Sequence, residues 1–501
     1  MTLVRAALSL LFAFSLAGCS TPRPTGYLAI EDQITARGGL GENGIFHDVV
    51  YNPESISLSF PGYIIGLDKG RRRAVLKGYS DSDLRLSTDQ PDEQWGIKRF
   101  KERVRTDPKV HYISHIIRNF GRPYGAGNCI LYSIYRDWGS VDGLDIPVKG
   151  NPDDDLKKDC DGRAPTFGST LNAYNDSVVA LEVLKSELES QKSLDGKEYT
   201  HVLVVVMGWN TRQTEAIQNY NAIVSHIKHA SETDGSFRPL FIGVTWASEW
   251  TAEWFEPAVR LVSFPAKAND ADEVGLSWLG AVLNVISTQY EGKPKVAIGH
   301  SFGARALTSA LCTGPQISLP PFATISNGES EEVSAIKTSA SKPKPMWDLF
   351  FGWQPAFPMG RFENNGARDG FRYPYGCARV RHMVMTASVN DQAVRSDWGF
   401  DMIGASSVRT EACKPTSANR FQRKLACIDE DQVRNSPKFS IDWTPDALNY
   451  VDASNIVWFS QPNTGGGAHS DIYRAVHGRL AWSAIQRLAR PPDGIASTAT
   501  R

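Results

Sequence analysis

A serine between glycines is the first pattern in this chain that could perform covalent chemistry. Gly299-His300-Ser301-Phe302-Gly303 matches G-x-S-x-G, and it lies between an apolar segment at 295–298 and a helical pattern at 302–311. A tight strand-to-helix turn projects a serine hydroxyl clear of a sheet, where it can attack a carbonyl carbon. Because so short a motif also arises by chance, the strand–turn–helix context carries the prediction. We predict that Ser301 is a nucleophile; the alternative is an ordinary glycine-rich turn.

A nucleophilic serine needs a base, and the base needs an acid to orient it. Asp391 lies just past an apolar segment at 380–386, where a parallel sheet places its active site. Asp397 is the nearest competitor. We predict Asp391 as the acid, although a surface turn would also explain it.

The predicted base is His469, which ends a glycine-rich loop at 465–468 and precedes a closing helical pattern at 472–489. A flexible loop of this kind can lay an imidazole between a serine and an aspartate. His477 falls inside the closing helix and is a poorer candidate, while an ordinary loop position remains the alternative for His469.

Two hydrogen-bond donors must stabilise the oxyanion of the tetrahedral intermediate. One expected donor is the backbone N–H of Phe302, and the other is the N–H of Trp209 in the loop that follows an apolar segment at 201–207. Trp209 could instead pack against the sheet, and Asn210 is expected to cap the next helix.

Aromatic residues cluster after a second apolar segment at 240–246. Trp246, Trp250, Trp254 and Phe255 could line an acyl pocket or a lid, or they could pack in the core. The sequence leaves both possibilities open.

The elements that must position these residues alternate between apolar strands and helices. This alternation predicts an α/β fold, with a mostly parallel sheet covered by helices on both faces. We expect strands near 201–207, 240–246, 295–298, 346–353, 380–386 and 455–460, and helices near 178–188, 215–230, 278–290, 302–311 and 472–489.

From about residue 170 to 490 the chain resembles the α/β-hydrolase superfamily of lipases, esterases and thioesterases. The resemblance rests on the order of the serine, aspartate and histidine along the chain and on the glycine loop before the histidine. The chain departs from the superfamily at Met207, where many relatives have a histidine before the oxyanion loop. Asp348 lies inside an apolar segment and ranks below Asp391 as the acid.

The resemblance implies a serine hydrolase that cleaves small-molecule or lipid carboxylic esters through an acyl-enzyme on Ser301, with no cofactor. Thioesterase or peptidase activity would use the same groups. A non-catalytic envelope lipoprotein with this fold as a binding scaffold is the competing hypothesis.

The N-terminus resembles a bacterial lipoprotein signal. One positive charge at Arg5 precedes an apolar run that ends in Leu16-Ala17-Gly18-Cys19. This pattern predicts a signal peptide over 1–18 and acylation of Cys19, which would anchor the chain in the bacterial cell envelope. Ser20, in place of aspartate, favours the outer membrane.

The remaining chain is divided by composition. We expect a lipidated tether over 19–45, an N-terminal extension of unknown fold over 46–165, and a hydrolase domain over 166–495 with insertions near 314–345 and 396–450. The 501 residues carry a formal net charge of −1, which provides no general attraction for nucleic acid. The oligomeric state is left open.

Six cysteines remain if Cys19 is acylated, an even number that permits disulfides in an exported protein. The short separations favour Cys129 with Cys160 and Cys413 with Cys427. No cysteine or histidine spacing matches a zinc site, so no metal is expected.

Overall fold

The computed structural model describes residues 58–490 with internal gaps. The gaps are 70–79, 86–93, 107–109, 122–127, 135–139, 142–143, 146–159, 169–172, 195, 209–210, 212, 233–236, 249–255, 320–342, 395–400, 434–438, 440 and 461–465. The predicted signal peptide, Cys19 and the tether lie outside the described residues, as does most of the insertion near 314–345.

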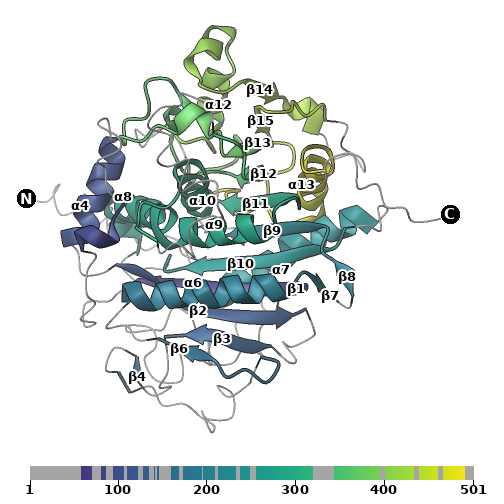
Figure 1. The fold of residues 1–501 in the computed structure, drawn as a ribbon. Helices are drawn as coiled ribbons and strands as arrows, with labels where there is room; N and C mark the ends of the chain where they lie inside the picture. The colour runs from purple at the N-terminus through teal and green to yellow at the C-terminus, as the bar shows by residue number, and fades with distance from the viewer. Residues whose placement is uncertain are drawn as a thin grey trace, which may run out of the picture.

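An 11-stranded sheet forms the centre of the protein, in the order β14-β15-β13-β12-β11-β9-β10-β1-β2-β3-β6 (Figure 1). All neighbouring strands are parallel except at β1–β2 and β2–β3. The strands are β1 Pro61–Lys69, β2 His111–Phe120, β3 Cys129–Ser133, β6 Thr166–Phe167, β9 His201–Val206, β10 Pro239–Trp246, β11 Lys295–His300, β12 Trp347–Trp353, β13 Val380–Ala387, β14 Leu425–Ile428 and β15 Leu448–Asp452.

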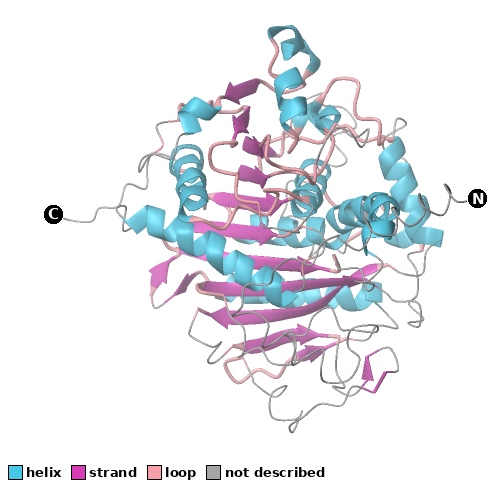
Figure 2. Ribbon diagram, turned by 180° about the vertical axis from the view of Figure 1, so that it is seen from behind, coloured by secondary structure: helices cyan, strands magenta, loops and turns pink. Residues whose placement is uncertain are grey.

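Helices cover both faces of this sheet, as Figure 2 shows from behind. On one face α7 packs against α13, and on the other α10 packs against α8 and α9, with α6 beside α9. The predicted α/β fold with a mostly parallel sheet is therefore confirmed. The main helices are α4 Trp95–Thr106, α6 Ala173–Ser190, α7 Gln213–Ser231, α8 Glu256–Val274, α9 Gly280–Gln289, α10 Phe302–Thr313, α12 Ser406–Ala412 and α13 Ala475–Leu488.

The segment 46–165, for which the sequence predicted no fold, supplies three strands to the same sheet. β1 pairs in parallel with β10, and β2 and β3 follow in antiparallel order. The central residues of β1 are buried, because strands flank it on both edges and helices cover the sheet.

The strand predicted near 455–460 is wrong. The strand is β15, Leu448–Asp452, and 455–460 forms a turn and an extended loop. The apolar run there resembles a buried strand, but Trp458 and Phe459 are exposed. β15 escaped prediction because polar Asn449 interrupts it; the Asn449 amide is buried and donates to Met383 O and Thr444 O.

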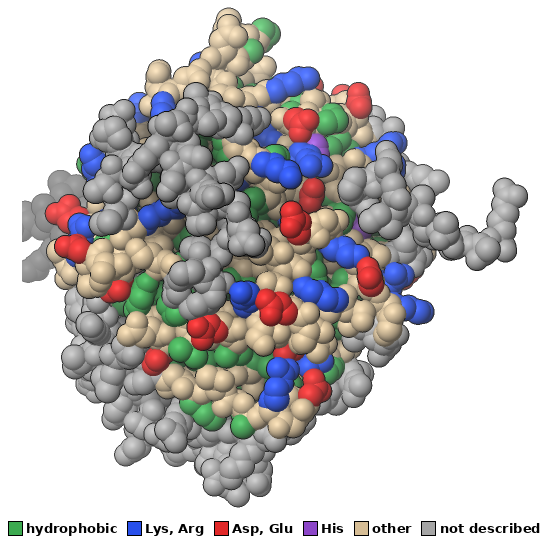
Figure 3. Space-filling model, in the orientation of Figure 1, with side chains coloured by type: hydrophobic (Ala, Val, Ile, Leu, Met, Phe, Trp, Pro, Cys, Tyr) green, Lys and Arg blue, Asp and Glu red, His purple; other side chains and the backbone are tan. Residues whose placement is uncertain are grey.

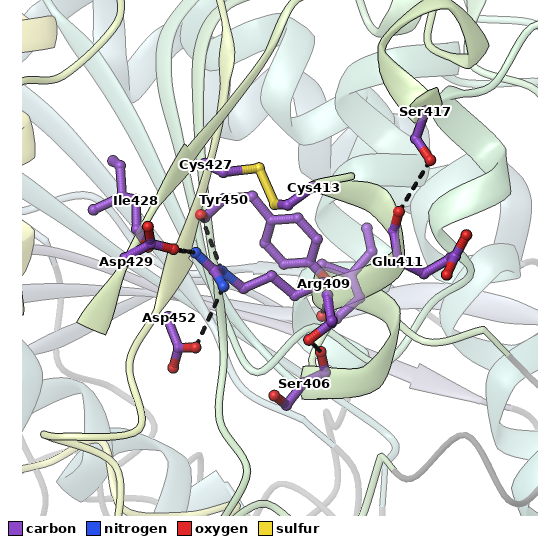
Figure 4. Close-up of a disulfide and its surroundings, with 12 residues drawn as sticks. Ser406, Arg409, Glu411, Cys413, Ser417, Cys427, Ile428, Asp429, Tyr450 and Asp452 are labelled. Carbon is purple, nitrogen blue, oxygen red and sulfur yellow. Dashed lines mark hydrogen bonds and ion pairs between the residues drawn. A yellow bond between two sulfur atoms is a disulfide. The ribbon is translucent and has the colours of Figure 1, made fainter. Parts of the chain in front are cut away.

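Three disulfides join the six cysteines. The predicted pairs Cys129–Cys160 and Cys413–Cys427 are confirmed, and Cys312 pairs with Cys377. Figure 4 shows Cys413–Cys427 beside the buried Arg409, whose guanidinium contacts Asp429 and Asp452. Disulfides are typical of proteins outside the cytoplasm.

Within the described ranges, no helix combines the length and apolar composition needed to cross a bilayer. On the face drawn in Figure 3, basic and acidic side chains are interspersed. This mixture agrees with the near-zero formal charge of the chain.

Candidate active site

Ser301 occupies a strained turn between β11 and α10. Its backbone has φ 53° and ψ −124°, in the region that favours glycine. Three backbone hydrogen bonds hold the turn: the Ser301 N–H donates to Trp353 O (3.1 Å), and Ser301 O accepts from Ala356 N (3.2 Å) and Arg305 N (3.3 Å). Strain of this kind costs about 1–3 kcal/mol and is common at functional sites. The predicted strand–turn–helix around Ser301 is present.

Two glycines permit the close packing around this serine. A Cβ at Gly303 would lie 2.3 Å from Val206 O, and a Cβ at Gly208 would lie 2.7 Å from Ser301 Cβ. Both clashes involve the segment that ends β9. The loop after β9 therefore lies directly against Ser301, where a second oxyanion donor is required.

The strand order explains why these loops meet. From β9 the chain passes to β10 on one side, and then crosses to β11 on the other side. Loops that leave neighbouring strands in opposite directions create a crevice at the carboxyl edge of a parallel sheet. Ser301 and Gly208 lie at this edge.

Asp391 and His469 meet as predicted. His469 Nδ1 and Asp391 Oδ2 are 2.7 Å apart, and the Asp391 side chain has no exposed surface. The other carboxylate oxygen, Oδ1, accepts the N–H groups of Ala393 (2.9 Å) and Val394 (3.3 Å). The carboxylate is thus fixed from both sides and orients the imidazole.

His300 joins the serine turn to the histidine loop. Its Nε2 lies 2.9 Å from His469 O, and the two imidazole centroids are 4.7 Å apart. Burial, together with the neighbouring His469, lowers the pKa of His300 to about 3. His300 is therefore neutral near pH 7, and because its partner is a carbonyl, Nε2 carries the proton and donates. The G-x-S-x-G pattern treats this position as variable, so the sequence contained no signal for this contact.

The Ser301 hydroxyl itself forms no hydrogen bond with any described residue, the His469 ring included. Catalytic hydrogen bonds are often long in unliganded proteins and tighten when substrate binds. The geometry of the site thus rests on the His300 contact and the Asp391–His469 pair.

Two side chains hold the backbone of Met207 on both sides of its Cα, in the segment beside the serine, and we call this pair of hydrogen bonds the clamp on Met207. The Met207 N–H donates to the Tyr220 hydroxyl (3.3 Å), and the Trp246 indole N–H donates to Met207 O (2.9 Å). Trp246 is buried and contributes to the core. The clamp therefore fixes the backbone at Met207, the position where many members of the superfamily have a histidine.

Of the other predicted oxyanion donors and aromatic residues, the structure describes Phe302. Phe302 is buried at the first position of α10, next to Ser301. Trp209, Asn210, Trp250, Trp254 and Phe255 lie outside the described residues.

Two of the rival candidates, Asp348 and His477, have other hydrogen-bond partners. Asp348 accepts the N–H of Lys295 (2.9 Å) at the start of β11, at the opposite edge of the sheet from Ser301. His477 is buried in α13 and its Nε2 lies 3.0 Å from Ile456 O; burial lowers its pKa to about 4. Asp397 lies outside the described residues.

A buried ion network holds the nucleophile helix from behind. Arg361 contacts Asp272 (2.8 Å) and Asp369 (2.7 Å), and Arg305, one turn after Ser301, contacts Asp272 (2.6 Å). Burial alone would raise the pKa of Asp272, but the two guanidinium groups outweigh it and lower the pKa.

Among the described residues, no group of three or more His, Cys, Asp or Glu side chains could hold a metal ion. Comparisons of the chain with protein-family models, with curated proteins and with solved structures returned no match.

Proposed function

We propose that this protein is a serine hydrolase that cleaves carboxylic esters through an acyl-enzyme on Ser301. The observation that carries the proposal is the His469–Asp391 hydrogen bond, linked through His300 to a serine in a strained strand-to-helix turn. This arrangement resembles the α/β-hydrolase superfamily, in which the same three residue types follow in the same order.

Each residue has a defined part in the proposed reaction. Ser301 Oγ attacks the carbonyl carbon, and His469 Nε2 takes the hydroxyl proton and returns it to the leaving alcohol. Asp391 accepts the Nδ1–H of His469, which keeps Nε2 unprotonated and aimed at the serine. Water then attacks the acyl-enzyme by the same route and releases the acid.

Two backbone donors would stabilise the oxyanion, the N–H of Phe302 and that of Trp209. The clamp on Met207 supports the second assignment, because it fixes the backbone that leads into the Trp209 peptide. Removing one such donor typically costs about 100- to 1,000-fold in kcat.

A fluorophosphonate probe tests the nucleophile directly. It should label the wild-type protein and leave Ser301→Ala unlabelled. An unlabelled wild-type protein that also cleaves no ester, thioester or amide would favour the non-catalytic scaffold.

Ester turnover tests the triad as a unit. Ser301→Ala and His469→Ala should each lower kcat by about 10⁴-fold or more, and the double variant should be little worse than either. Asp391→Asn should be costly but milder, while Asp397→Asn should stay near wild type. Loss of activity at Asp397 with none at Asp391 would overturn the assignment of the acid.

Nitrophenyl esters, a thioester and an amide assayed side by side separate the proposed activity from thioesterase and peptidase activity.

A further inference from the structure

Three exposed apolar side chains gather beside the proposed catalytic pair. Val389, Trp458 and Phe459 are 66%, 55% and 49% exposed, and we refer to them as the apolar rim. Exposed apolar residues scattered singly are normal, whereas a cluster beside a functional site indicates a binding surface.

Hydrogen bonds fix the rim to the loops that hold Asp391 and His469. The Val389 N–H donates to Ser454 Oγ (3.1 Å), and Asn390 Nδ2 donates to Val457 O (3.1 Å), so the acid loop lies against the segment that leads to Trp458.

The aromatic half of the rim is fixed in the same way to the histidine loop. The N–H groups of Trp458 and Phe459 both donate to Asp471 Oδ2, at 2.9 and 2.8 Å. Asp471 lies two residues after His469. The rim is therefore a fixed part of the site's surroundings.

We propose that the apolar rim docks this face of the protein on a phospholipid bilayer. Tryptophan and phenylalanine favour the boundary between headgroups and acyl chains, where an apolar ring can be buried beside polar groups. The Arg474 guanidinium lies 5.0 Å from the centre of the Trp458 ring, and its side chain is part-exposed. Because Arg474 also forms an ion pair with Asp471, it helps to fix the Trp458 ring, and the proposed attraction to the bilayer comes from the apolar side chains.

A second protein molecule is a poorer occupant. Three side chains about half exposed present on the order of 300 Å², whereas a stable protein interface buries about 800 Å² on each partner. A bilayer needs no matching surface of that size, because shallow insertion of a few rings is sufficient for weak binding.

The expected acylation of Cys19 makes such weak binding useful. Residues 20–57 can span at most about 130 Å, whereas a folded unit of this size has a radius of gyration of only about 22 Å. An anchor of that reach would hold the protein near the membrane without selecting a face. The rim would select the face, and it would bring the active site to lipid-borne substrates.

Vesicle binding tests the rim without depending on the proposed hydrolase activity. The chain is exported without acylation, with residues 1–19 replaced by a cleavable secretory signal. It is then floated with vesicles of phosphatidylethanolamine and phosphatidylglycerol. Trp458→Ser combined with Phe459→Ser should weaken binding by more than about tenfold. Trp95→Ser is the matched control, because Trp95 is 56% exposed and begins α4, which lies on the opposite side of the molecule from α13 in Figure 1.

Three results would overturn the proposal: no vesicle binding by the parent chain, equal loss in Trp95→Ser, or a dimer that the double variant dissociates. The activity measurement is separate. The double variant should retain turnover of a soluble short-chain ester and lose it selectively on an ester embedded in vesicles. If vesicle binding behaves as expected and no ester is cleaved, the hydrolase proposal fails and the docking proposal stands.

Discussion

His300 shows how much a residue outside the proposed triad can contribute to it. Its imidazole lies against the His469 ring at a tilt of 41°, and its Nε2–H donates to the backbone carbonyl of that residue. A second positive charge at this distance would oppose protonation of His469 during turnover. Burial keeps His300 neutral and removes that opposition.

Replacing His300 should therefore lower turnover without unfolding the site. His300→Phe keeps a ring but loses the donor, and we expect kcat to fall by about 10- to 100-fold, because small displacements of a base are costly. His300→Gln retains an N–H donor and should recover part of the loss. Since the pKa of His300 is about 3, the acid limb of the pH–rate profile above pH 4 should show one ionisation in the wild type and in both variants. A second ionisation that disappears in His300→Phe would contradict the neutral assignment.

At the residue scale, the turn at Ser301 and the contact between Asp391 and His469 were predictable because their signals are local, while the catalytic roles of these residues remain predictions. The serine turn was predictable because strand, glycines and helix are adjacent in sequence, and Asp391 and His469 because each follows a strand or a glycine loop. His300 was not predictable, because its partner lies 169 residues away and the motif places no constraint on it. Cys312 and Cys377, 65 residues apart, likewise carried no short-loop signal.

At the scale of elements, the clamp on Met207 connects α7 and β10 to the loop beside Ser301. Tyr220 comes from α7 and Trp246 from the end of β10, so two elements of the central fold hold the two peptide groups on either side of the Met207 Cα. Both side chains are buried, so they restrict the movement of the Met207 backbone.

Loss of either hydrogen bond of the clamp should lower kcat with little change in KM, because the oxyanion forms only after substrate has bound. We expect about a 10- to 100-fold decrease for Trp246→Phe and a smaller one for Tyr220→Phe. Trp278→Phe is the control, because this buried indole also donates to a backbone carbonyl, His111 O at 2.8 Å, which belongs to β2. Equal loss of kcat in Trp278→Phe would show that the effect is general destabilisation.

The ion network behind α10 should matter for stability and for its pH dependence. Arg361→Met leaves Asp272 and Asp369 to share Arg305, so that one buried negative charge is unbalanced, and it should cost about 3–5 kcal/mol in urea unfolding. Arg420→Met removes an exposed contact with Glu363 and should cost less than about 1 kcal/mol. If Arg361→Met lowers the free energy of unfolding no more than Arg420→Met does, the buried network does not stabilise the fold.

The pH dependence follows from the lowered pKa of Asp272. Its stabilising effect is present above the unfolded pKa of about 4. It is lost as the pH falls toward the lower folded pKa. Wild-type stability should thus begin to decline below about pH 5 and should continue to decline below about pH 3, and Arg361→Met should flatten this decline.

Element prediction failed for two physical reasons. Charged and irregular segments separate β1, β2 and β3, so the sequence did not indicate that these three strands continue the sheet beyond β10. The segment 455–460 has the composition of a buried strand but exposes its aromatic residues at the rim. In both cases tertiary position, which the local sequence does not encode, decides the outcome.

At the scale of the whole molecule, the expected lipid anchor remains a prediction from the sequence. The wild-type protein, expressed in a Gram-negative host, should require detergent for extraction from membranes. Cys19→Ala should either be released by a carbonate wash or accumulate with its signal peptide uncleaved. A matured Cys19→Ala protein that still requires detergent would contradict the anchor.

The three disulfides have a consequence for how the protein is made. In order along the chain, the first cysteine after Cys19 pairs with the second, the third with the fourth, and the fifth with the sixth. A dithiol oxidase that joins cysteines as they emerge from a translocation channel would therefore produce the native set without any reshuffling. Export from a host that lacks a disulfide isomerase should give the same yield of folded protein as export from a host that has one. The order of synthesis would itself select one pairing from the 15 that six cysteines allow.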